Sequence, residues 1–254
     1  MKEFREIMGM PVVIEVHDAH ASLEDLDSVF AYFRFVDEKF STYKETSEIT
    51  QINKGLLAEN SYSDDMKKVF ALSEETKQLT HGYFDIRTID GSIDPSGLVK
   101  GWAIHEGACM LKRKGYKNFY VEIAGDIEVA GNNGENEEWK IGIREPVPSS
   151  NNIVKTLHLT NCGIATSGTY LRGQHIYNPR EKKKEISDIL SITVIGPNIY
   201  EADRFATAAF AMGEKGIHFI EQLSGFEGYQ INSQMVATMT SGFEKYSCSY
   251  VSTN

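Results

Sequence analysis

The chain has 254 residues, of which 41% are hydrophobic and 24% are charged. This composition is typical of a folded globular protein and excludes a disordered one. The formal net charge is −10 at pH 7, and no Lys/Arg run is interleaved with aromatic residues, so we expect no nucleic-acid partner. So acidic a surface repels a polyphosphate ligand unless a cation offsets the field, and an anionic substrate would therefore imply a metal.

The beginning of the sequence shows no targeting signal. Residues 1–16 include Glu3 and Glu6 and lack an apolar stretch long enough for a signal peptide. The sequence also lacks a membrane-spanning segment and a lipid-attachment cysteine near its start. We expect a cytoplasmic protein, although a trimmed exported form would have the same sequence, and one domain over residues 1–254.

Strong helical patterns occupy the first half of the chain. A β-branched run at 12–16 predicts a strand, and Ser22 with Asp25 forms a capping-box pattern before apolar residues at helical spacing up to Phe40. A second helix is predicted over residues 64–79, ended by Gly82. A third is predicted over residues 98–114, ended by Gly115.

From residue 118 the pattern changes to short strand-like runs separated by turns. These runs are FYVEI, IEVAG, WKIGI, VKTLHL, HIY and SITVIG. A helix is then predicted from Glu201 through Ala211 and a shorter one over 217–223, with strand-like segments near Tyr229 and Met235. Because strands and helices are clustered and do not strictly alternate, the order favours an α+β fold.

Asp203 and Thr207 are candidate cation ligands. They are four residues apart on a predicted helix, so both side-chain oxygens lie on one face. Oxygen ligands of this kind suit Mg²⁺, which also keeps water or phosphate oxygens. Spacing alone favours an ordinary structural role, in which Asp203 complements the positive end of the helix and Thr207 packs inside.

Two further segments carry groups that suit an anionic ligand. In IDPSGLVKGWAI, Asp94 precedes a Gly-containing turn and a helix that bears Lys100, a counter-charge for an anion. In IATSGTYLRGQHIY, a predicted small-residue turn at 166–168 precedes His175, a side chain able to accept a proton near neutral pH. Each segment on its own also fits an ordinary helix start or β-turn without a ligand. Only the combination of the segments is informative.

Asp126 and two aromatic residues complete the candidates. Asp126 follows a predicted tight turn, where it can cap backbone amides or face a ligand, and capping is the favoured interpretation. Tyr43 and Phe84 are placed to flank an aromatic ligand, although aromatic residues at such positions also pack in cores.

In their order along the chain, these segments resemble the ApbE family, the FAD:protein FMN transferases. The resemblance spans nearly the whole sequence, and several blocks in one order are more specific than any single motif. The blocks are MGMPV, FSTYKETSEITQIN, GYFDIRT, IDPSGLVKGWAI, the AGD turn, WKIGIREP, IATSGTY, HIYNP and EADRFATAAFAMG. The resemblance implies a two-lobed α+β fold with mixed or antiparallel sheets, flanking helices and a flavin cleft between the lobes.

The resemblance also implies an activity and a set of site residues. The activity is Mg²⁺-dependent transfer of the FMN moiety of FAD to a Thr or Ser hydroxyl of an acceptor protein with an FMN-binding domain, with release of AMP. The implied Mg²⁺ site comprises Asp203, Thr207 and the main-chain carbonyl of Gly97, and the implied general base is His175. Implied flavin contacts are Met8, Tyr43, Tyr83, Phe84, Asp85, Asp94, Lys100 and Ile176.

Several positions depart from the family pattern. His105 stands in place of an Asp, Glu122 in place of an Asn and Ala124 in place of the first Gly of a Gly-Gly-Asp turn, changes that can reshape a flavin pocket. Ala206 stands where some members have a second metal-site carboxylate, and Asn178 replaces an Asp.

Two alternative functions follow from the same residues. One is an FAD pyrophosphatase that uses water as the nucleophile and releases free FMN without an acceptor. The other is a non-catalytic flavin-binding protein, which leaves FAD intact when Mg²⁺ and an acceptor are present.

Overall fold

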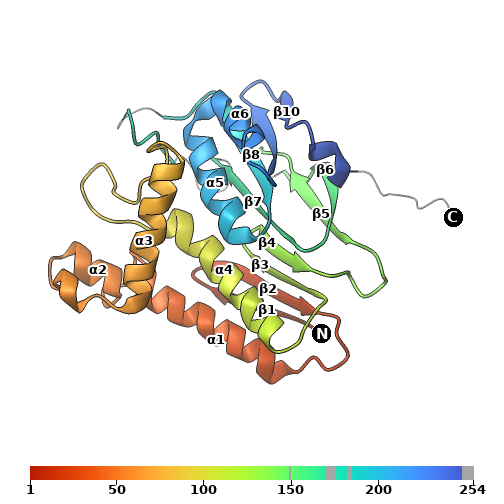
Figure 1. The fold of residues 1–254 in the computed structure, drawn as a ribbon, viewed down its shortest axis with the longest axis horizontal. Coiled ribbons are helices and arrows are strands. Elements are labelled where there is room, and N and C mark those ends of the chain that lie inside the picture. The colour runs from red at the N-terminus through yellow and green to blue at the C-terminus, as the bar shows by residue number, and fades with distance from the viewer. Residues whose placement is uncertain (149, 170–175, 182–184, 248–254) are drawn as a thin grey trace.

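The computed structural model describes residues 1–148, 150–169, 176–181 and 185–247. Within these residues, one antiparallel sheet has the strand order β1-β2-β3-β4-β7-β8-β9-β10 (Figure 1). Its strands are β1 (Lys2–Ile7), β2 (Met10–Val16), β3 (Phe119–Ile123), β4 (Asp126–Ala130), β7 (Cys162–Gly168), β8 (Ile189–Gly196), β9 (Glu227–Asn232) and β10 (Ala237–Met239).

Helices cover one face of this sheet and a hairpin covers the other. The helices are α1 (Leu23–Phe40), α2 (Glu48–Asn53), α3 (Asp64–Leu79), α4 (Ser96–Arg113), α5 (Ile199–Ala211) and α6 (Gly216–Glu221). In Figure 1, α4 and α5 lie across the sheet. Strands β5 (Trp139–Arg144) and β6 (Ile153–Leu159) form the hairpin. Because side chains alternate along a strand, Val194 packs in the core under the helices while Ile195 packs in the core under the hairpin.

This combination of helices and antiparallel strands confirms the α+β prediction. The Ser22 hydroxyl accepts a hydrogen bond from the backbone of Asp25 at the start of α1, as the capping pattern predicts. Gly82 and Gly115 have positive φ after α3 and α4. Helix α5 begins two residues before the predicted start because Asn198 is its N-cap. Among the residues described, no helix is both long and apolar enough to cross a membrane.

Some local predictions were wrong. Residues 166–168 are the end of strand β7 and do not form a turn. The predicted strand HIY is not formed at Tyr177, which makes an isolated β-bridge to Glu185, and His175 lies outside the described residues. Met235 has positive φ and lies in the turn between β9 and β10. Strand β1 was not predicted, because at the sheet edge it alternates charged and apolar residues without a buried β-branched run.

The chain order places the long helices between two neighbouring strands. Strand β2 pairs with β3 in a register that joins Val12 to Ile123. Helices α1 to α4 therefore form one insertion between adjacent strands, and this insertion carries α4 across the sheet toward α5.

Side-chain contacts to a buried carboxylate fix α4 over β4. Glu128, on the helix-facing side of β4, is 1% exposed. Its carboxylate lies 2.9 Å from both Lys112 Nζ and His105 Nδ1, and it accepts the backbone N–H of Ile199 at 3.3 Å. Because a buried carboxylate needs such partners, this cluster ties β4 to α4 and to the first residue of α5.

Removing one partner of the buried carboxylate tests this arrangement. We expect Lys112→Met to lower the free energy of unfolding by about 1.5–3 kcal/mol, the usual value of a hydrogen bond to a charged group. Lys140→Met is the control, because the Lys140–Glu137 pair is exposed and should contribute about 1 kcal/mol or less. Urea unfolding measures both variants, and equal losses would contradict the structural role of the contact between Lys112 and the buried carboxylate of Glu128.

Candidate active site

Two adjoining cavities form a cleft beside the first turn of α4. The first has a volume of about 330 Å³ and lies among the 83–97 segment, α5 and the end of β7. The second, of about 300 Å³, lies between the β1–β2 turn and the end of α1. Met10, Asp94, Ser96 and Lys100 line both cavities, so the two lie next to each other. Together they have the size of a small-molecule site.

The described site residues all line this cleft. Those of the first cavity are Tyr83, Phe84, Asp85, Asp94, Gly97, Lys100, Ile176, Asp203 and Thr207. Met8 and Tyr43 line the second cavity, and Tyr43 is 96% exposed at its mouth. His175 lies outside the described residues. The fold thus brings these distant segments together, while the role of each residue stays a prediction.

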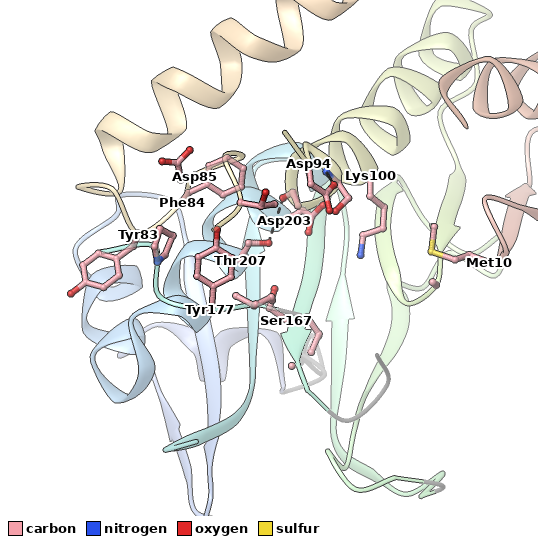
Figure 2. Close-up of a pocket in the computed structure, with 18 residues that line it drawn as sticks. Met10, Tyr83, Phe84, Asp85, Asp94, Lys100, Ser167, Tyr177, Asp203 and Thr207 are labelled. Carbon is pink, nitrogen blue, oxygen red and sulfur yellow. Dashed lines mark hydrogen bonds between the residues drawn. The ribbon is translucent and has the colours of Figure 1, made fainter. Parts of the chain in front are cut away.

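Three oxygen atoms that could bind a metal lie where α4 faces α5. They belong to Asp203, Thr207 and the Gly97 carbonyl. Asp203 and Thr207 lie at the centre of the cleft in Figure 2. The Thr207 hydroxyl donates to the Gly97 carbonyl at 3.4 Å, and Asp203 Oδ2 accepts the backbone N–H of Gly101 at 2.8 Å. A carboxylate, a hydroxyl and a carbonyl are hard ligands that suit Mg²⁺. No group of three or more His, Cys, Asp and Glu side chains that could hold a metal occurs in the described part of the chain.

The wall formed by residues 83–94 is held by its own polar contacts. Phe84 is buried, and its N–H donates to the Thr80 hydroxyl at 3.1 Å. Asp85 pairs with Lys77 Nζ at 2.7 Å. The Tyr177 hydroxyl donates to the Arg87 carbonyl at 3.0 Å, which joins this wall to the segment after β7. These contacts fix the aromatic wall to the end of α3 and to the segment after β7.

Lys100 is held by an acidic partner. Its ammonium forms an ion pair with the buried carboxylate of Asp126, which also accepts the backbone N–H of Thr166 at 3.2 Å. Asp126 does accept a hydrogen bond from a backbone amide, as predicted. That amide belongs to Thr166 on β7 and not to the turn that precedes Asp126. Asp126 therefore links Lys100 to the strand on the opposite side of the cleft.

The first cavity is electrostatically negative. Among the described residues that line it are the three carboxylates of Asp85, Asp94 and Asp203 and the ammonium of Lys100. Burial raises the pKa of the Tyr177 hydroxyl, and the charges of Asp85, Asp90 and Asp94 raise that pKa further. An anionic ligand would therefore need a cation in this cavity.

Sequence reasoning did not name several lining residues, among them Met10, Thr88 and Tyr177. Each of these three has a usable signal in the sequence. Met10 belongs to the MGMPV block that contains Met8, and Tyr177 directly follows Ile176. Thr88 is the last residue of the GYFDIRT block that contains Tyr83, Phe84 and Asp85.

Most departures from the family pattern lie away from the cleft. Ala124 lines the first cavity. His105 pairs with Glu128, and Glu122 accepts the Tyr120 hydroxyl, so neither lines the two cavities. Ala206 is buried in α5, and Asn178 accepts the N–H of Arg180 at 3.0 Å. That His105 and Glu122 reshape a flavin pocket stays a prediction, and any such effect would have to act through the residues that line the cavities.

Ala124 is strained at the turn between β3 and β4. It has φ 51°, and Gly125 follows with φ 91°, a two-residue turn in which glycine is preferred at both positions. We expect Ala124→Gly to raise the free energy of unfolding by roughly 1 kcal/mol, because the left-handed conformation penalises a Cβ. Ala31→Gly, at an exposed position inside α1, should instead lower it by about 1 kcal/mol. Thermal and urea unfolding compare the two, and a loss of stability in both would contradict the strain.

The sequence is similar to those of known proteins. The sequence profile described as the ApbE family matches residues 8–90 and 87–229. An FAD:protein FMN transferase from Vibrio cholerae is 29% identical over 165 residues, which are 62% of this chain and 48% of that protein. One from Haemophilus influenzae is 24% identical over 86% of this chain and 82% of that protein. The chain thus spans about half the length of the Vibrio relative that it matches.

Solved structures share the fold. The flavin transferase ApbE from Vibrio cholerae superimposes with a TM-score of 0.84 at 20% identity, over 97% of this chain and 99% of that one. An ApbE protein from Thermotoga maritima gives a TM-score of 0.86 at 18% identity, over 98% and 99% of the two chains. The arrangement of sheet and helices described above is therefore the fold of these proteins.

Proposed function

This chain belongs to the ApbE family, and we propose that it is an Mg²⁺-dependent FAD:protein FMN transferase. It moves the FMN moiety of FAD onto a Thr or Ser hydroxyl of an acceptor protein with an FMN-binding domain and releases AMP. The observation that carries the proposal is the meeting of Asp203, Thr207 and the Gly97 carbonyl at the centre of a negative cleft. The names of the sequence relatives support the same activity.

In this proposal, Asp203, Thr207 and Gly97 would hold Mg²⁺. All three offer oxygen, and they are too few to complete six-fold coordination, so water or pyrophosphate oxygens would supply the rest. When bound, the cation offsets the charge of the pyrophosphate and stabilises the charge that develops on its oxygens.

The other cleft residues bind and orient FAD. Lys100 adds a positive charge beside the pyrophosphate, and Asp126 keeps its ammonium in place. Tyr83 and Phe84 offer aromatic surface for the flavin ring, on the wall held by Thr80 and Asp85. The remaining proposed flavin contacts are Met8, Tyr43, Asp94 and Ile176.

The transfer step exchanges one P–O bond for another. The acceptor hydroxyl oxygen attacks the FMN-side phosphorus, and the bond from that phosphorus to the oxygen of the AMP phosphate breaks, so AMP leaves in line. The hydroxyl proton passes to a general base, for which the resemblance proposes His175. A single domain over residues 1–254 and a cytoplasmic location stay predictions.

The direct test is a transfer assay with the full chain. FAD, Mg²⁺ and a purified FMN-binding acceptor domain are mixed, and the acceptor mass is measured after denaturation. We expect a covalent gain of one FMN, lost with chelator and reduced roughly 10²-fold or more in Asp203→Ala and His175→Ala, as for loss of a charge-stabilising or proton-transfer group. Asp64→Ala, which changes a fully exposed carboxylate on α3, is the control and should transfer at the wild-type rate.

The same assay separates the alternative functions. Appearance of FMN and AMP with no gain in acceptor mass would identify an FAD pyrophosphatase. FAD that stays intact with Mg²⁺ and the acceptor would identify a flavin-binding protein. Wild-type transfer by Asp203→Ala would contradict the proposed metal site.

The Thr207 hydroxyl can be tested separately by its dependence on Mg²⁺. Thr207→Val keeps the shape of the side chain and removes the oxygen, so we expect half-maximal transfer to require roughly tenfold more Mg²⁺ or greater, the effect of losing about 1.4 kcal/mol of binding. Thr207→Ser restores the hydroxyl and should bring the requirement back toward the wild-type value. Equal Mg²⁺ requirements in wild type and Thr207→Val would exclude the hydroxyl as a ligand.

A further inference from the structure

Helices α4 and α5 lie very close together at Gly101. A Cβ placed on Gly101 would lie 2.6 Å from Asp203 Cβ and 2.9 Å from both Asp203 Oδ2 and the Ile199 carbonyl oxygen. These distances are shorter than real Cβ contacts, and two of the three atoms that would have to move belong to Asp203. A side chain at this position would therefore push α5 away from α4 at the proposed metal ligand.

The backbone of Gly101 also contacts the same carboxylate. Its N–H donates to Asp203 Oδ2 at 2.8 Å in a buried setting. In a regular α-helix that N–H is the partner of the carbonyl four residues earlier, which is the Gly97 carbonyl. The Gly101 N–H therefore has two possible acceptors, the Gly97 carbonyl of the regular helix and the Asp203 carboxylate. Both acceptors belong to the proposed metal site.

We propose that Gly101 is a positioning residue for the metal site. Its N–H fixes the orientation of the Asp203 carboxylate, and its missing side chain sets the separation between the Gly97 carbonyl on α4 and the Asp203 and Thr207 oxygens on α5. The inference rests on the proposed function. Mg²⁺ demands near-octahedral geometry with short bonds, so a shift of roughly 0.5 Å between the helices weakens its binding.

Gly107 on the same helix provides a matched control. A Cβ there would lie 2.7 Å from Phe33 Cζ and 3.1 Å from Val29 Cγ1, both on α1. Gly107→Ala therefore crowds the core by a similar amount as Gly101→Ala. It does so against α1 and not against the ligands on α5.

The experiment measures Mn²⁺ binding to the full chain with FAD present, from the electron paramagnetic resonance signal of free Mn²⁺, alongside thermal unfolding. Mn²⁺ takes octahedral oxygen sites like those of Mg²⁺. We expect Gly101→Ala to raise the Kd for Mn²⁺ roughly tenfold or more, and Gly107→Ala to leave it within about twofold of wild type while lowering the melting temperature.

Three outcomes would overturn the inference. An unchanged Kd in Gly101→Ala, with wild type binding Mn²⁺, would remove the positioning role and leave the proposed metal site intact. Equal weakening by Gly107→Ala would show a general loosening of the core. Failure of the wild type to bind Mn²⁺ would overturn the metal site together with this inference.

A second comparison applies if Gly101→Ala does not fold. In metal-free protein, Asp203→Asn keeps an oxygen that can accept the Gly101 N–H, whereas Asp203→Ala removes it. We expect Asp203→Asn to melt about 2–4 °C above Asp203→Ala, the shift that one hydrogen bond gives in a chain of this size. Equal melting temperatures would mean that the Gly101 contact does not hold the carboxylate.

Discussion

The contact between α4 and α5 at Gly101 is the constraint on which the geometry of the cleft depends. Because no side chain separates the two helices there, the first turn of α4 and the second turn of α5 face one small space. Glu128 secures the same junction from below, since its carboxylate binds α4 side chains and the first N–H of α5. The side of the cleft formed by α4 and α5 is thus a result of helix packing.

Helix α5 is also anchored on its far side. Arg204 is buried, and its guanidinium donates to Glu201, to the Thr76 hydroxyl at 3.1 Å and to the Tyr200 hydroxyl at 3.0 Å. Since Thr76 belongs to α3, this contact connects α5 to the helix that leads into the aromatic wall. Asp203 and Arg204 are neighbours in sequence but lie on different faces of α5. Asp203 lines the cleft, whereas Arg204 contacts α3.

Local sequence pattern predicted those elements whose signals are local. Helices α1 and α3 combine Ser caps with apolar periodicity, whereas the edge strand β1 lacks a buried run. For the site, spacing left Asp203 and Thr207 with two interpretations, because the contact of Thr207 with Gly97 spans 110 residues of sequence and that of Asp203 with Gly101 spans 102. The pairing of Lys100 with Asp126 likewise depends on how α4 lies over β4. The predicted metal site and flavin contacts therefore came from the resemblance to a family, because no local pattern contains them.

The pairing of β2 with β3 has a consequence for how the chain acquires its structure. The apolar residues Val12, Ile14 and Val16 are fully buried in the finished sheet, yet β3, the second strand that pairs with β2, begins only at Phe119. During synthesis the β1–β2 hairpin therefore emerges long before its neighbour, while α1 to α4 form from contacts close in sequence. Closing so long a loop is slow, and until then the hairpin presents an unpaired apolar edge of the kind that chaperones protect.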